Sequence, residues 1–367
     1  MRVLVMGGSA FNGRALVPVL VEAGHDVTLC NRGRTKIDHP AGVQTLAADR
    51  TDHDQVRSVL GGSEWDCVLD MTAYHPEDVQ LMVDLFDGNV GHYVFVSSTV
   101  TYATVDDEHP GPITESHPDE RGPNQFEYGL DKLRCEDLLF ARHAETRFPA
   151  TSVPLGMSFG PHNALPNREQ RMFHRMATGR TILLPGDGTA ATNVGHVHDQ
   201  ARAFEALMGV EASFGRRFNL TGDDPHTNEQ YIRTFADVVG TDPEIVPVPA
   251  ELMDALWDGE IRVTMPQGTA ASMDIRPTAE ARDRVMPHVH KMPIASLTQR
   301  LQPSIHRWDV DCIFSVEAMK AVTGWAPAHT FESLVEDTYR WWSTTDQSHV
   351  EHDYVFEDEI LDLVRQS

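Results

Sequence analysis

The chain has 367 residues, with 55 acidic against 30 basic side chains and a formal net charge of −25. This length suits one large or two modest domains, and this charge repels nucleic acid and anionic membrane surfaces, so we expect neither as a partner. The sequence shows no export signal and no apolar run of about 20 residues, and the spacing of its four cysteines indicates neither a disulfide framework nor a zinc site. We therefore expect a cytoplasmic protein.

The first 14 residues predict a dinucleotide cradle. An apolar run at 2–6 indicates a strand, which a glycine turn separates from a helical pattern that continues past Arg14. In such a unit the backbone N–H groups of the turn and the helix N-terminus face the pyrophosphate of the cofactor. The expected cofactor contacts in the turn are Gly7, Ser9, Ala10, Phe11, Asn12 and Gly13.

Two further strands, at 27–30 and 43–47, indicate which cofactor is bound. Sites that prefer NAD usually place Asp or Glu after the second strand, whereas Arg accommodates the 2′-phosphate of NADP. This chain has Asn31 and Arg32 there, so NADP is favoured and NAD stays open. The third strand leads to Asp49 and Arg50, where the adenine is expected.

Strands at 67–70, 93–98 and 152–155 alternate with helical segments near 52–60 and 76–86. This alternation predicts the α/β class, with a Rossmann-type doubly wound parallel sheet. Ligands bind beyond the carboxyl ends of such strands. The further cofactor contacts expected at those ends are Thr72, Ala73, Tyr74, Ser97, Leu155 and Met157.

Tyr128 and Lys132 lie four residues apart in a helical pattern and therefore share one face of the helix. An ammonium near a phenol favours the phenolate, so we expect the pKa of Tyr128 to fall from about 10 toward neutrality. A tyrosine with such a pKa can move a proton on a substrate hydroxyl or carbonyl. Taken alone, the spacing also fits an unrelated Tyr and Lys on a solvated helix.

Several motifs together are typical of one family: the glycine turn, Asp49, Ser97-Ser98-x-x-x-Tyr102, Tyr128-x-x-x-Lys132, Phe159-Gly160-Pro161, Pro185-Gly186-Asp187-Gly188 and His196-Val197-His198-Asp199. With them the chain resembles an extended short-chain dehydrogenase/reductase, of the NAD-dependent epimerase/dehydratase family. The resemblance implies that Ser98 is the catalytic hydroxyl and Tyr128 the acid/base. It also implies that Lys132 binds the ribose and activates Tyr128.

The chain departs from the family pattern at three places. Ala10 replaces the middle glycine, as in an atypical branch that includes plant chloroplast stem-loop RNA-binding proteins, so the fold alone does not establish an activity. Thr99 and Val100 stand where the 4,6-dehydratases carry Asp-Glu, so that route of dehydration lacks its acid and base. Thr192 stands where nucleotide-sugar epimerases usually carry Arg, which disfavours a bound nucleoside diphosphate.

The resemblance also implies a division of the chain. We expect an NAD(P)-binding domain at 1–160, to which 190–220 returns, and a smaller α/β substrate lobe at 161–189 and 221–345, followed by an acidic tail at 346–367. Thr99, Arg276 and Arg307 are candidate substrate contacts, the two arginines as anion contacts from a stretch expected to cover the substrate. The pairs His196/His198 and His288/His290 lack an evident third ligand, so we predict no metal.

The function expected from these residues is that of an NAD(P)-dependent oxidoreductase or epimerase acting on a secondary alcohol of a sugar-like substrate, in a homodimer. An epimerase would return the hydride to the other face of the same carbon, whereas a dehydrogenase or reductase would release product after one transfer. Both use the same residues, so the sequence does not separate them. The alternatives are a nucleotide-sugar epimerase and a non-catalytic cofactor-sensing or RNA-binding protein.

Overall fold

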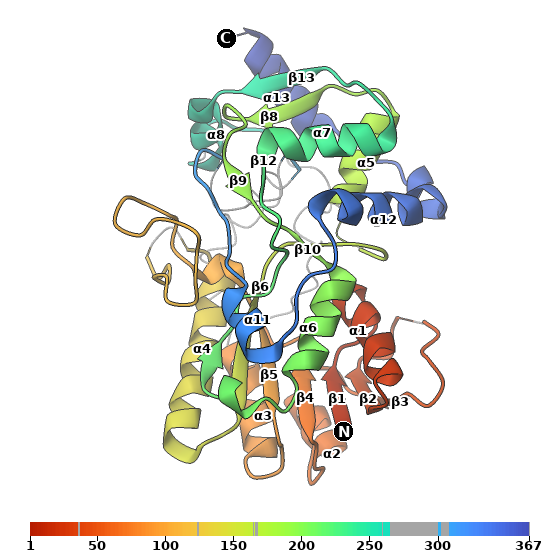
Figure 1. Cartoon of the computed structure of the whole chain (residues 1–367), viewed down its shortest axis with the longest axis vertical. Helices are drawn as coiled ribbons and strands as arrows, with labels where there is room; N and C mark the ends of the chain where they lie inside the picture. Colours follow the sequence, from red (N-terminus) through yellow and green to blue (C-terminus); the bar gives the residue numbers. More distant parts are fainter. Residues whose placement is uncertain are drawn as a thin grey trace.

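The computed structural model describes residues 1–35, 37–122, 125–163, 165, 168–258, 260–264, 300–301 and 308–366 (Figure 1). Its largest sheet has seven strands: β1 (Arg2–Met6), β2 (Asp26–Asn31), β3 (Gln44–Ala47), β4 (Cys67–Asp70), β5 (Tyr93–Ser98), β6 (Ala150–Leu155) and β11 (Arg216–Arg217). Their order across the sheet is β11-β6-β5-β4-β1-β2-β3, and every pairing is parallel. The predicted Rossmann-type doubly wound sheet is therefore confirmed.

Helices cover both faces of this sheet. They are α1 (Phe11–Glu22), α2 (His53–Leu60), α3 (Pro76–Phe86), α4 (Glu127–Thr146), α6 (Val197–Leu207) and α11 (Glu317–Thr323), with a 3-10 turn, η1 (Thr99–Thr101), directly after β5. One buried cluster joins the sheet to α1, α6 and α11, and a second joins it to α2, α3 and α4. Because strands covered on both faces must be apolar on both, β1 and β4 are continuous apolar runs rather than alternating ones.

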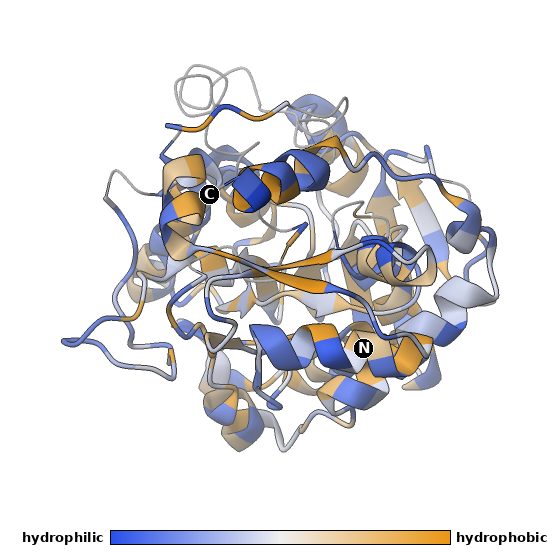
Figure 2. Cartoon of the chain, turned by 90° about the horizontal axis from the view of Figure 1, so that it is seen from above, coloured by the Kyte–Doolittle hydropathy of each residue, from blue (hydrophilic) through white to orange (hydrophobic). Residues whose placement is uncertain are grey.

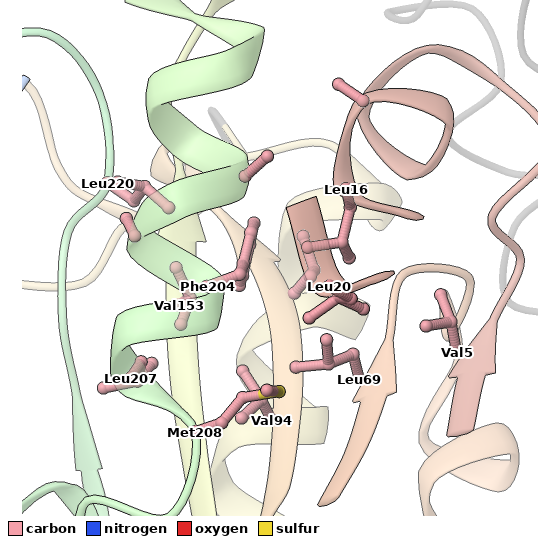
Figure 3. Close-up of a cluster of buried hydrophobic side chains, with 14 of the residues drawn as sticks. Val5, Leu16, Leu20, Leu69, Val94, Val153, Phe204, Leu207, Met208 and Leu220 are labelled. Atoms are coloured by element: carbon pink, nitrogen blue, oxygen red, sulfur yellow. The ribbon is translucent and has the colours of Figure 1, made fainter. Parts of the chain in front are cut away.

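The cluster on the α1 and α6 face fixes the helices that frame the glycine turn. Leu16 and Leu20 of α1 and Phe204 of α6 lie over the sheet residues Leu69, Val94 and Val153 (Figure 3). All six of these side chains are at most 1% exposed. Burying each of them contributes roughly 1.5–3 kcal/mol, which anchors the N-terminus of α1 beside β1.

The rest of the chain folds beyond the carboxyl ends of the large sheet (Figure 1). It contains three two-stranded pairings: β7 (Ser158–Phe159) with β10 (Gly195–His196), β9 (Ala191–Thr192) with β12 (His226–Thr227), and β8 (Ile182–Pro185) with β13 (Ile245–Val248). Its helices are α5 (Glu169–Ala177), α7 (Asn228–Val239), α8 (Ala250–Trp257), α12 (Phe331–Ser343) and α13 (Val355–Gln366), with a short 3-10 turn η5 (Asp346–His349). A further 3-10 turn, η2 (Glu211–Ser213), lies at the opposite end of the large sheet, where Thr151 at the start of β6 donates to the carbonyl of Ser213 at 2.9 Å. Figure 2 shows apolar strand segments at the centre of this view and hydrophilic residues on the surrounding helices.

The helices near 52–60 and 76–86 are confirmed as α2 and α3. The division of the chain into domains at 160 and 345 stays a prediction. Among the described helices, none combines the length and the apolar character needed to cross a membrane. All four cysteines are buried.

Candidate functional site

The glycine turn after β1 leaves open backbone above the sheet. Gly7 and Gly8 have φ of 110° and 89°, in the region that favours glycine. A Cβ on Gly7 would lie 2.9 Å from Thr72 Cγ2, and one on Gly13 would lie 2.6 Å from the Cα of Gly8. No side chain caps the N-terminus of α1 at Ala10, so its first N–H groups are open to an anion. The turn therefore fits a dinucleotide pyrophosphate.

The remaining side chains of the turn are held by the protein itself. Phe11, with φ of 28°, is buried in the core beneath the turn. The Asn12 amide donates to Gln200 Oε1 at 3.1 Å and to Ser158 Oγ at 3.3 Å, which joins the turn to α6 and β7. Ser9 Oγ accepts a hydrogen bond from Asn31 Nδ2 at 3.0 Å, which joins the turn to the end of β2.

Asn31 takes the position where an acidic residue would bind the ribose 2′-hydroxyl. Its Oδ1 accepts from the N–H of Gly33 at 2.8 Å, so both polar atoms of its side chain are engaged. Arg32 is exposed, and Arg34 Nη2 lies 3.7 Å from Asp49 Oδ2. The edge of the adenosine site near β2 is therefore lined by an amide and two guanidinium groups.

Arg50 is directed into the protein rather than toward the expected adenine. Its guanidinium forms a two-point ion pair with Asp70, at 3.1 and 2.8 Å, and donates to the carbonyl of Asp78 at 3.1 Å. Tyr93 also donates to Asp70, at 2.7 Å. Because these contacts engage the charge inside the fold, we no longer assign Arg50 to the cofactor.

Two buried carboxylates hold the loop after β4, and sequence reasoning missed both. Asp70 Oδ1 accepts the N–H groups of Thr72 and Ala73 at 3.1 and 3.0 Å. Asp78 Oδ2 accepts the N–H groups of Tyr74 and His75 at 3.1 and 3.2 Å. The available signal was an Asp ending a buried strand, since a buried carboxylate requires partners.

Ser98, Tyr128 and Lys132 gather at the end of β5, and α4 supplies the last two. The hydroxyls of Tyr128 and Ser98 lie close enough for Ser98 to influence the pKa of the phenol. The Lys132 ammonium is buried, donates to the carbonyls of Ala73 and Val96 at 2.7 Å each, and lies 5.7 Å from the centroid of the Tyr128 ring. The expected proximity of the three residues is thus present in the fold.

The expected fall in the pKa of Tyr128 is wrong for the protein by itself. Burial raises the pKa of the Tyr128 phenol above its ordinary value, and the neighbouring Ser98 hydroxyl only opposes that rise. Burial also lowers the pKa of Lys132 to about 8. The ammonium is bonded to two carbonyls instead of the phenol, so desolvation outweighs its attraction for a phenolate.

The other predicted site residues take varied positions around the strand ends. Ser97 and Thr99 are buried beside Ser98. Leu155 forms a bridge with Leu220, and the carbonyl of Met157 accepts from the N–H of Gly195 at 2.8 Å.

Thr192, which replaces the usual arginine, and the two predicted anion contacts bear on how a substrate is bound. Thr192 donates to the carbonyl of Cys312 at 3.0 Å, which engages it between strands. The predicted anion contacts Arg276 and Arg307 lie outside the described residues.

A further cation near the site was not predicted. Arg168 immediately precedes α5 and is half-buried, and its Nη1 donates to the carbonyl of Ser158 at 3.4 Å. Its positive charge acts to lower the pKa of Tyr128 against the larger effect of burial.

Within the described residues, two groups of side chains have metal-like spacing: His196 with His198 and Asp337, and His196 with Asp199 and His329. The Nδ1 atom of His196 accepts from the N–H of His198 at 3.3 Å, so its proton sits on Nε2, which donates to Asp337 at 3.2 Å. A metal on Nε2 would force that proton onto Nδ1, against the N–H of His198. We therefore assign no metal to either group.

Solved structures with this fold cover nearly the whole chain. A dTDP-glucose 4,6-dehydratase of Bacillus anthracis in complex with NAD superposes with a TM-score of 0.67 at 16% identity, covering 95% of this chain and 98% of that one. A UDP-glucose 4-epimerase of Thermus thermophilus in complex with NAD gives a TM-score of 0.64 at 18% identity, covering 94% and 100%. At these identities the likeness shows the fold alone.

Sequence relatives carry different activities in their names. A chloroplast stem-loop binding protein of 41 kDa from Arabidopsis thaliana is 30% identical over 67% of this chain, a match that spans only 65% of that relative. A 2'-dehydrokanamycin reductase of Streptomyces kanamyceticus is 28% identical, covering 68% of this chain and 70% of the relative. A UDP-glucose 4-epimerase of Corynebacterium glutamicum is 28% identical, covering 69% and 83%.

A family model matches residues 3–221, more than half of the chain, and includes the glycine turn, Ser98, Tyr128 and Lys132. It describes NAD-dependent enzymes, which confirms both the resemblance predicted from the motifs and the predicted enzyme class. The chain belongs to the NAD dependent epimerase/dehydratase family.

Proposed function

We propose that this chain is an NAD(P)-dependent oxidoreductase or epimerase that acts on a secondary alcohol of a sugar-like substrate. The observation that carries the proposal is the Tyr128–Ser98 hydroxyl pair at the end of β5, with buried Lys132 one helical turn further along α4. The names of two relatives, a UDP-glucose 4-epimerase and a 2'-dehydrokanamycin reductase, support substrates that resemble sugars.

The cofactor, once bound, accepts or donates the hydride, and the residues of the chain handle the proton. Ser98 would hold the substrate oxygen by a hydrogen bond while Tyr128 transfers the proton. Burial raises the pKa of Tyr128, so its phenol is protonated at neutral pH and ready to donate to a carbonyl oxygen. Lys132, fixed by the carbonyls of Ala73 and Val96, would present its remaining N–H to the cofactor ribose.

We infer a preference for NADP over NAD. The end of β2 offers Asn31, whose amide is engaged by Ser9 and Gly33, followed by the exposed guanidinium of Arg32. A hydrogen bond to a charged group contributes roughly 1.5–3 kcal/mol, so Arg32→Gln should weaken NADPH binding by about tenfold or more and leave NADH binding unchanged. Fluorescence titration of both cofactors measures this, and equal effects on the two would contradict the preference.

The reaction type is tested by cofactor stoichiometry. The purified protein is incubated with NADP or NAD and a panel of free and phosphorylated sugars, while NAD(P)H is followed at its absorbance and products by chromatography. A dehydrogenase forms one NAD(P)H per product, whereas an epimerase forms product with no net NAD(P)H. Absence of any hydride transfer across the panel, with the cofactor bound, would favour the cofactor-sensing or RNA-binding alternative.

We further propose that substrate selection does not depend on a nucleoside diphosphate. Thr192 occupies the position of the usual arginine, and its hydroxyl is engaged by Cys312. Calorimetric titration with UDP, GDP and dTDP in the presence of NADP tests this. Micromolar binding of any of them would contradict the proposal and favour the alternative function, that of a nucleotide-sugar epimerase. A homodimer and a cytoplasmic location remain predictions.

A further inference from the structure

Arg168, directly before α5, and Arg175, within it, form no ion pair with a carboxylate among the described residues. Among the arginines of the described ranges that are buried or half-buried, all but Arg168 and Arg175 form an ion pair with Asp or Glu. In a chain with 55 acidic residues, a buried arginine without a carboxylate is unexpected. The carboxylates that act on their charges from further away are Glu169 for Arg168 and Glu357 for Arg175, and Glu357 is already paired with Arg171. Because burying a charge without a direct partner is costly, such a pair calls for a ligand that supplies negative charge.

The two guanidinium groups come from the two ends of α5. Arg168 is the residue directly before the helix, Arg175 lies in its last turn, and the charges of both act on Tyr231 of α7. Arg168 makes one long hydrogen bond, 3.4 Å, to the neutral carbonyl of Ser158. Arg175 is 1% exposed and donates to the carbonyl of Thr181 at 2.7 Å, while its Nε and Nη1 have no partner.

The position of Arg168 connects it with the proposed reaction site. Its partner Ser158 also accepts a hydrogen bond from Asn12 of the glycine turn, so Arg168 lies beside the cofactor cradle. Its charge opposes the rise that burial causes in the pKa of Tyr128. Burial likewise raises the pKa of Tyr231 on α7, and there the charges of both Arg168 and Arg175 oppose the rise. In Figure 1, α5 lies with α7 and α12 beyond the large sheet.

We propose that Arg168 binds an oxyanion, a carboxylate or a phosphate, carried by the sugar-like substrate beside Tyr128, and that Arg175 of α5 adds a second positive charge that has no ion-pair partner in the described part of the chain. The proposal rests on the function proposed above, and it narrows the substrate class to sugar acids and sugar phosphates. Arginine suits this role because its planar fork meets both oxygens of such a group. A neutral sugar would leave both guanidinium groups without a direct anionic partner.

Calorimetric titration of the NADPH-loaded protein with glucose 6-phosphate, gluconate and glucose tests the site without requiring turnover. We expect the two anions to bind and glucose to bind at least tenfold more weakly, with the stronger anion identifying the source of the oxyanion. Arg168→Gln should weaken the anion by about tenfold or more, and Arg168→Lys by less, because it keeps the charge but loses the fork. Arg180→Gln, just beyond α5 and paired with Asp358, is the matched control and should leave binding unchanged.

Three outcomes would overturn the proposal. One is equal binding of the anions to wild type and Arg168→Gln, and another is no anion binding to wild type. The third is a tenfold loss of NADPH affinity in Arg168→Gln, which would assign the arginine to the pyrophosphate of the cofactor. A melting curve of Arg168→Gln without ligand should match or exceed that of wild type, because the change removes an unpaired charge. Failure of hydride transfer with intact anion binding would instead refute the proposed function alone.

Discussion

Replacing Asp70 by Asn should destabilise the fold more than any surface charge change, because Asp70 is the centre of a buried network. Its side chain is 0% exposed and accepts from Arg50, Tyr93 and the N–H groups of Thr72 and Ala73. The amide keeps the shape of the carboxylate but loses its charge, which leaves the Arg50 guanidinium with Asp78 alone, at 3.6 Å. Removing one partner of a buried ion pair costs about 3–5 kcal/mol.

The cost is measured by urea unfolding at pH 7, from the free energy of unfolding extrapolated to water. The matched control is Asp84→Asn, which breaks an exposed pair with Arg57 at 3.6 Å and should change the free energy by about 0.5 kcal/mol or less. The double variant Asp70→Asn with Arg50→Gln should be less destabilised than the sum of the two single variants, because neither charge is then left unpaired. A cost below about 1 kcal/mol for Asp70→Asn, or strict additivity in the double variant, would refute the reasoning.

Two further predictions concern the glycine turn and a buried glutamate. Gly13→Ala places a Cβ 2.6 Å from the Cα of Gly8. The variant should therefore have a lower melting temperature and bind NADPH at least tenfold more weakly in a fluorescence titration. An unchanged NADPH affinity would contradict the close packing of the turn. Burial raises the pKa of the Glu169 carboxyl to about 7 from its ordinary 4.5. Between these two pH values the folded protein keeps the carboxyl protonated, whereas the unfolded chain ionises it. The stability that this proton contributes is therefore fully present below pH 4.5 and is lost as the pH rises through 7. The free energy of unfolding of Glu169→Gln should therefore rise relative to that of wild type between pH 5 and pH 8, by up to about 3 kcal/mol. If urea unfolding gives a difference between the two proteins that is constant across this range, Glu169 does not titrate there.

Local patterns were sufficient to predict the frame of the site. The apolar run at 2–6, the glycines after it and the Tyr128–Lys132 spacing depend only on neighbours in sequence, and the structure has each as an element of the expected type. The parallel order of the strands follows from their alternation with helices, since such crossovers leave few topologies.

Pairings between distant residues were not predictable in the same way. The Arg50–Asp70 ion pair joins residues 20 apart, and which of several acidic side chains faces Arg50 is decided by the packing of β4 beside β1. The direction of the shift in the pKa of Tyr128 also depends on burial, which the four-residue spacing of Tyr128 and Lys132 does not indicate. Arg168 became informative only once the carboxylate partners of the other arginines were known.

The central claim is that Tyr128 transfers the proton in a hydride-transfer reaction, and Tyr128→Phe tests it most directly. With a substrate that the wild-type protein turns over, single-turnover measurement of NAD(P)H formation or consumption should show a rate lower by about 10²–10⁴-fold. The affinity for NAD(P)H should be unchanged, because Lys132 keeps its bonds to Ala73 and Val96. A Tyr128→Phe variant that transfers hydride at the wild-type rate would contradict the account.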